Sequence, residues 1–292
     1  VKHPWQLFVL LFPGILMVSC AGAPKMLSIA DSDRKFAAGA VIDTRIGRSI
    51  DFETLIRDLS SVQVVYVGEQ HTRAEHHRIQ LQILEALDGL DRPLVVGMEM
   101  FDRTYDPVLA AWSQADMTEE VFIQKTHWYA NWRYDFGLYR DLLQAVKERR
   151  LPLYGLNIPF HIPAKIAAGG IDSLLFPDRQ FVPETVDLSD TRHREYLEKV
   201  YAHHRMTKRN HFEFFYQAQC VWEDAMAEAV AEHLGDRRML VIAGNGHIVQ
   251  KFGIPNRAFR RTQTPFRTVY LAAAGDTVDL DSGDYIWVTP SR

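Results

Sequence analysis

The stretch Val64–Leu87, VVYVGEQHTRAEHHRIQLQILEAL, joins two patterns that together favour an α/β fold. Its first four residues are apolar and rich in β-branched side chains, which predicts a buried strand that stops at Gly68. From His76 onward, apolar residues recur every three or four positions, which predicts a helix with one buried face. Glu69 and His71 therefore follow the end of a strand, where α/β proteins usually build a site.

Three more apolar runs predict strands, at Pro93–Met100, Leu151–Gly155 and Arg238–Ala243. Helical patterns separate them, and closing strands are expected at Thr268–Ala273 and Tyr285–Val288. This alternation predicts a three-layer α/β fold, with a mainly parallel sheet and helices on both faces. Other elements are expected as a hairpin over 40–50 and helices at Asp51–Leu59, Asp106–Ser113, Thr118–Lys125, Pro163–Ala168, Asp190–His203 and Asn210–Leu234.

Polar residues lie at the ends of four of these strands. Because the carboxyl ends of parallel strands share one edge of a sheet, we expect these side chains to converge on one pocket. The expected pocket residues are Glu69, His71, His76, Glu99, Asn157, Asn245 and His247.

Two interpretations fit such a pocket. Glu69, His71, Glu99 and His247 could hold a divalent metal whose bound water attacks an ester or amide, which would make them the catalytic residues of a hydrolase. Alternatively, they form a hydrogen-bonded structural network and ligands bind elsewhere.

Composition places the chain among ordinary globular proteins. Its 292 residues are 47% hydrophobic and 24% charged, with a net charge of −4. That charge argues against broad electrostatic binding of nucleic acid. The two cysteines give neither a disulfide framework nor a cysteine-based zinc motif, and we expect Cys220 to be a buried, inert thiol.

The N-terminal segment has the outline of a secretory signal. Lys2 and His3 precede the largely apolar run Trp5–Val18, and small residues surround Cys20. A cysteine at that place is typical of a bacterial lipoprotein, with lipid on Cys20 tethering the chain to a membrane. We therefore expect a lipoprotein signal peptide over 1–20, a linker over 21–35 and a single domain over 36–292.

Seven motifs together resemble the ChaN family of haem-binding lipoproteins, within the Tiki/TraB/erythromycin-esterase-like superfamily. They run from about Ala40 to Arg261. They are GExH at Gly68–His71, HH at His76–His77, QL at Gln80–Leu81, Glu99, NIP at Asn157–Pro159, AQCVWEDAMA at Ala218–Ala227 and AGNGHIVQKFGIP at Ala243–Pro255.

The resemblance implies an outer-membrane lipoprotein that faces the periplasm and serves haem or iron uptake. In that family, haem is held between the subunits of a dimer: a tyrosine of one ligates the iron, and a histidine and a lysine of the other contact the propionates. The candidate haem-binding residues here are Tyr201, Tyr129, Tyr134, His204, Lys165 and Lys208.

The same superfamily contains metal-dependent proteases that resemble Tiki, whose GxxH and glutamate motifs match Gly68–His71 and Glu99. Hydrolysis is therefore the alternative function, and a catalytically silent scaffold at the membrane is a third.

Two further features of the sequence are expected to have structural roles. The aromatic stretch His127–Tyr139 is expected to pack the core or form a lid, and Arg257, Arg260 and Arg261 are expected to form a solvated basic edge.

Overall fold

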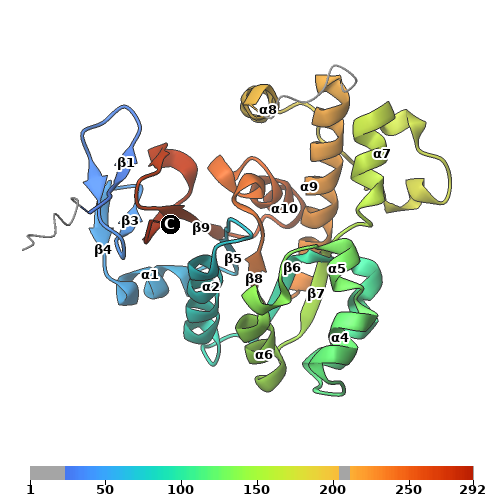
Figure 1. Cartoon of the computed structure of the whole chain (residues 1–292), viewed down its shortest axis with the longest axis horizontal. Helices are drawn as coiled ribbons and strands as arrows, with labels where there is room; N and C mark the ends of the chain where they lie inside the picture. Colours follow the sequence, from blue (N-terminus) through green and yellow to red (C-terminus); the bar gives the residue numbers. More distant parts are fainter. Residues whose placement is uncertain (1–23, 204–210, 292) are drawn as a thin grey trace, which may run out of the picture.

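The computed structural model describes residues 24–203 and 211–291 and is built around one eight-stranded sheet (Figure 1). The strand order is β4-β3-β11-β9-β5-β8-β6-β7, and neighbouring strands from β11 to β7 are parallel. This confirms the predicted fold class. The strands are β3 Val41–Asp43, β4 Arg48–Ile50, β5 Val64–Val67, β6 Leu94–Asp102, β7 Leu153–Asn157, β8 Arg238–Ile242, β9 Phe266–Ala273 and β11 Tyr285–Thr289.

Helices cover both faces of this sheet (Figure 1). Helices α1, α2, α3 and α6 pack on one face, and α9 and α10 on the other. The helices are α1 Phe52–Leu59, α2 Ala74–Leu87, α3 Asp106–Ser113, α4 Glu119–Lys125, α5 Trp128–Asn131, α6 Arg140–Glu148, α7 His161–Gly169, α8 Thr191–His203, α9 Phe212–Leu234 and α10 Ile254–Thr262.

Strand β5 shows why the sheet needs both layers. Its side chains alternate: Val65 and Val67 belong to the core under α1 and α2, whereas Val64 and Tyr66 belong to the core under α9 and α10. All four residues are almost fully buried. A strand that is apolar on both faces is stable only between two layers of helices.

The segment expected to be a linker instead contains a strand. Residues Leu27–Ile29 form β1, which pairs with β2 (Lys35–Phe36) and β10 (Thr277–Val278) in a second, three-stranded sheet. Leu27 is fully buried, in a cluster that also includes Ile42 and Val288. The linker prediction is therefore wrong for these residues. A three-residue strand is too short to show a periodic pattern in the sequence.

Strand β6 runs two residues beyond its predicted end, to Asp102, so Glu99 lies three residues before the end of the strand. The pairing of β6 with β7 shifts register between Met98 and Asp102. This irregularity surrounds Glu99 near the carboxyl edge of the sheet. In the described part of the chain, no helix is both long and apolar enough to cross a membrane.

Candidate functional site

Glu69 lies just beyond β5 and is the centre of a buried hydrogen-bond group. Its Oε1 accepts hydrogen bonds from the Tyr139 hydroxyl (2.5 Å) and from His71 Nδ1 (2.8 Å), and its Oε2 accepts one from Gln80 Nε2 (2.8 Å). Burial alone would raise the pKa of the Glu69 carboxyl, but hydrogen bonds from His71 and His77 outweigh it and lower the pKa well below 4.5. Glu69 is therefore a buried carboxylate.

His77 on α2 donates from both ring nitrogens. Its Nε2 lies 3.1 Å from the His71 carbonyl oxygen, and its Nδ1 lies 3.2 Å from Gln80 Oε1 and 3.4 Å from Glu69 Oε2. The amide group of Gln80 cannot be reversed, because its NH₂ donates to Glu69 and to the Gly68 carbonyl. With acceptors on both sides, the pKa of His77 is raised despite its burial, which favours the form protonated on both ring nitrogens.

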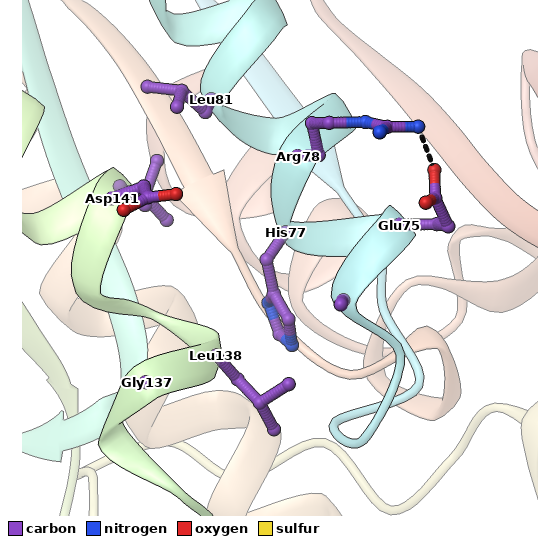
Figure 2. Close-up of a pocket in the computed structure, with 9 residues that line it drawn as sticks. Glu75, His77, Arg78, Leu81, Gly137, Leu138 and Asp141 are labelled. Atoms are coloured by element: carbon purple, nitrogen blue, oxygen red, sulfur yellow. Dashed lines mark hydrogen bonds and ion pairs between the residues drawn. The ribbon is translucent and has the colours of Figure 1, made fainter.

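His77 also lines a cavity of about 220 Å³ between α2 and the turn that precedes α6. Figure 2 shows His77 and Leu138 close together between the two segments, and the paired Arg78 and Glu75 on the side of α2 away from Asp141. The cavity therefore lies beside His77, where α2 and the start of α6 cover the Glu69 group.

A second buried group surrounds His247, which follows β8 in a short 3₁₀ turn, η5 (Asn245–His247). Its Nε2 lies 3.5 Å from Glu99 Oε1, and its Nδ1 lies 3.4 Å from Glu223 Oε1 on α9. Burial alone would lower the pKa of His247, but these two carboxylates outweigh it and raise the pKa to about 10. His247 is therefore an imidazolium held between two acids.

The two groups meet at Gly244. The Gly244 amide donates to Glu99 Oε2 (2.6 Å). A Cβ on Gly244 would lie 2.9 Å from His71 Cε1, 3.3 Å from His71 Nε2 and 3.4 Å from Glu99 Oε2. His71 and Glu99 therefore flank one point that only a glycine leaves open. The His71 side chain is 26% exposed, so it is the member of this group that solvent or a ligand reaches most easily.

Glu223 connects the site to a deeper network. Its Oε2 lies 3.3 Å from His193 Nε2 and 3.5 Å from Arg257 Nε, and all three side chains are buried. Arg257 also pairs with Asp224, next to Glu223 on α9. The prediction that Arg257 belongs to a solvated edge is wrong, because buried carboxylates bind its guanidinium inside the protein. Cys220, also buried, has its pKa raised by burial to about 12.

The two asparagines of the expected pocket support the backbone and an aromatic ring. Asn157 donates to the Glu99 carbonyl (2.9 Å), and its Oδ1 accepts from Trp222 Nε1 (2.5 Å). The Trp222 ring lies 5.1 Å from that of His247. Asn245 donates through its backbone amide to the Glu69 carbonyl (2.8 Å) and through its side chain to Leu271.

His76 lies apart from the two groups. Its Nδ1 accepts from the Gln70 amide (2.9 Å), and its Nε2 lies 3.4 Å from Thr289 Oγ1. Burial and the nearby Arg73 lower the pKa of His76 to about 3, so the ring is neutral. His76 therefore holds the loop after β5 and contacts none of the acids of the site.

The expected metal ligands are engaged with one another. Glu69 binds His71, and Glu99 faces His247. In residues 24–203 and 211–291, no three histidine, cysteine or acidic side chains gather as a metal-binding set. What the arrangement offers directly is acid–base chemistry, because each imidazole is oriented by a carboxylate.

The candidate haem-binding residues are spread over separate parts of the fold. Tyr134 lies beside the site, its ring 5.1 Å from that of His71, and Tyr129 on α5 is 55% exposed. Tyr201 on α8 packs against Phe212 and Phe215 of α9. Lys165 on α7 is half exposed and paired with Asp178. His204, Lys208 and Cys20 lie outside the described residues.

Four members of the site escaped the sequence analysis: Tyr139, His77, Glu223 and His193. Tyr139 ends the aromatic stretch, and His77 belongs to the HH motif, so both had a signal nearby. Glu223 stands inside an apolar helix pattern, where a buried acid needs a partner. His193 had no signal, because its contact depends on how α8 packs against α9.

Comparisons with known proteins agree with this fold. In solved structures the chain resembles ChaN of Campylobacter jejuni, described as binding haem cofacially, with a TM-score of 0.69 and 20% identity over 85% of this chain and 95% of that one. It also resembles an erythromycin esterase, EreC, in an open conformation, with a TM-score of 0.47 and 13% identity over 80% and 76% of the two chains. No curated protein matches the sequence. The model of the family "Haem-binding uptake, Tiki superfamily, ChaN" matches residues 55–258, and the chain belongs to that family.

Proposed function

We propose that this chain binds haem and serves haem or iron uptake as a lipid-anchored protein on the periplasmic side of the outer membrane. The observation that carries the proposal is the family match over residues 55–258. The solved structure of ChaN, described as binding haem cofacially, supports two stacked haems, one per chain, held between two copies of the chain.

Tyr201 is our first choice for the iron ligand. A phenolate oxygen suits ferric iron, and the rings of Phe212 and Phe215, 5.6 and 5.4 Å from that of Tyr201, supply an aromatic surface that suits a porphyrin. Tyr129 and Tyr134 are the competing ligands. His204, Lys208 and Lys165 are the candidate partners of the propionates, and Lys165 would exchange Asp178 for a propionate.

Hemin titration tests this proposal. The full chain should develop a Soret band with a stoichiometry near one haem per chain, and Tyr201→Phe should shift or abolish that band. Tyr154→Phe is the matched control, because Tyr154 lies on β7, the edge strand of the sheet, and its hydroxyl binds only Arg237 among the bonds described. Absence of a Soret change in the unaltered chain would refute haem binding, and loss in Tyr129→Phe or Tyr134→Phe alone would reassign the ligand.

Assembly and anchoring need separate measurements. Light scattering with and without hemin should show a dimer when haem is bound. Metabolic labelling with a fatty acid should mark the full chain, and Cys20→Ser should remove the label. A monomer that binds hemin tightly would leave haem binding intact and refute only the shared site.

A second candidate function, hydrolysis at the strand ends, is favoured by the geometry of His71. Glu69 accepts from His71 Nδ1, so in the neutral ring the lone pair lies on Nε2, on the side of Glu99 and Gly244. His71 would then act as general base and Glu99 would face the reacting group. Ester hydrolysis across a panel of nitrophenyl esters should fall to background in His71→Ala and persist in His233→Ala, whose ring stacks on Tyr154 away from this site. Elemental analysis of the same preparations measures any bound divalent metal.

A further inference from the structure

A cavity of about 160 Å³ separates α8 from the strand-end site. Its volume is close to the roughly 150 Å³ of an apolar protein cavity that holds benzene. One six-membered ring therefore fits in it. The cavity is lined by Tyr196, Leu197 and Val200 of α8, Phe215 and Gln219 of α9, and Gly246 and His247 of η5.

The lining disfavours an anionic ligand. Both ring nitrogens of His247 face carboxylates, Glu223 at 3.4 Å and Glu99 at 3.5 Å, so His247 has no free N–H group to offer a ligand. An anionic ligand in the cavity would stand near the two buried carboxylates and would be repelled by them.

The lining favours a ring with one neutral polar substituent. Leu197, Val200 and Phe215 present aliphatic and aromatic surface, which binds an apolar ring through dispersion and the hydrophobic effect. Gln219 contributes an amide that can both donate and accept a hydrogen bond. Such a combination of apolar walls and one or two polar groups is typical of small-molecule sites.

We propose that this cavity binds a single uncharged six-membered ring that carries a hydroxyl group, such as a phenol, with the hydroxyl at Gln219 and the ring beside Val200 and Phe215. A ligand seated there contacts His247 directly, so the cavity is a specificity pocket beside the strand-end site. This inference does not rest on haem binding, although Phe215 also belongs to the aromatic surface proposed for the porphyrin.

Phenol is the probe, and isothermal titration of the full chain measures it. Val200→Phe should fill the cavity and weaken phenol binding tenfold or more. Lys199→Phe places the same ring on the exposed side of α8 and should leave binding unchanged. Gln219→Leu should weaken phenol binding about tenfold and leave toluene binding unchanged, which tests the polar contact without altering α8.

Three outcomes would overturn the proposal. They are no saturable phenol binding to the unaltered chain, equal binding by Val200→Phe, and tighter binding of benzoate than of phenol. Circular dichroism of each variant, with the phenol-induced rise in melting temperature, establishes that lost binding is not lost folding. Should Val200→Phe fail to fold, the result for Gln219→Leu decides.

Discussion

Replacing Glu223 by glutamine should make the stability of the protein depend on pH in a way that reports the charge of His247. Glu223 and Glu99 face the two ring nitrogens of His247 at almost equal distances, 3.4 and 3.5 Å. Glutamine keeps the size and hydrogen-bonding capacity of the side chain but removes its charge. His247 then has one carboxylate instead of two.

The magnitude follows from the pKa of His247, which the two acids raise from 6.5 to about 10. One pKa unit corresponds to about 1.4 kcal/mol, so the imidazolium stabilises the folded protein by about 5 kcal/mol, of which Glu223 supplies about half. The estimate is in the range of about 3–5 kcal/mol for breaking a buried ion pair. Because the folded pKa lies above the unfolded one, this stabilisation is complete below pH 6.5 and is lost as the pH rises through about 10.

Urea unfolding at pH 6 and pH 10 measures the effect. Glu223→Gln should lose about 2–3 kcal/mol more at pH 6 than at pH 10, and a smaller residual loss at both should reflect the Arg257 contact at 3.5 Å. Glu228→Gln, on the same helix, removes a partly exposed pair with Arg103 and should cost no more than about 1 kcal/mol at either pH. An equal loss for Glu223→Gln at the two pH values would refute a charged His247.

Other substitutions probe the remaining contacts. Gly244→Ala should cost about 1–3 kcal/mol in chemical unfolding and shift the NMR signals of His71, because the new Cβ would lie 2.9 Å from the His71 ring. Tyr139→Phe removes a buried hydrogen bond to the Glu69 carboxylate and should cost about 1.5–3 kcal/mol at neutral pH. Since the pKa of Glu69 is lowered in the folded state, the unaltered protein should lose stability as the pH falls below 4.5, and Tyr139→Phe should lose less over that range.

The fold was predictable because its core strands carry a complete local signal. Val64–Val67 forms β5 with the predicted bounds, and Asp106–Ser113 forms α3 likewise. Asp51 caps α1 by accepting from the Thr54 amide, as its place before an amphipathic run indicates. These features are determined by residues close together in the sequence. The pairing of β1 with β10 is not, because it joins residues about 250 positions apart through a three-residue strand.

The site was only partly predictable, because its sequence signals gave strand ends but not side-chain partners. That Glu69 and His247 would follow strands could be read from the apolar runs before them. That Tyr139 would reach Glu69 depends on the packing of the aromatic stretch against α2, where Tyr139 lies 4.2 Å from the His77 ring. No local pattern encodes that contact.

In helix α9, the spacing of the apolar residues indicates that Glu223 is buried. Met226, Ala227 and Val230, which pack against the sheet, follow Glu223 at three, four and seven positions, so Glu223 lies on the same stripe of the helix. An acid on such a stripe must be buried, and a buried carboxylate must find a cation. Strand β8, under the same stripe, leads directly to His247. Helical register therefore marks Glu223 as a buried acid before any coordinates are known, whereas its pairing with His247 depends on how α9 packs over β8.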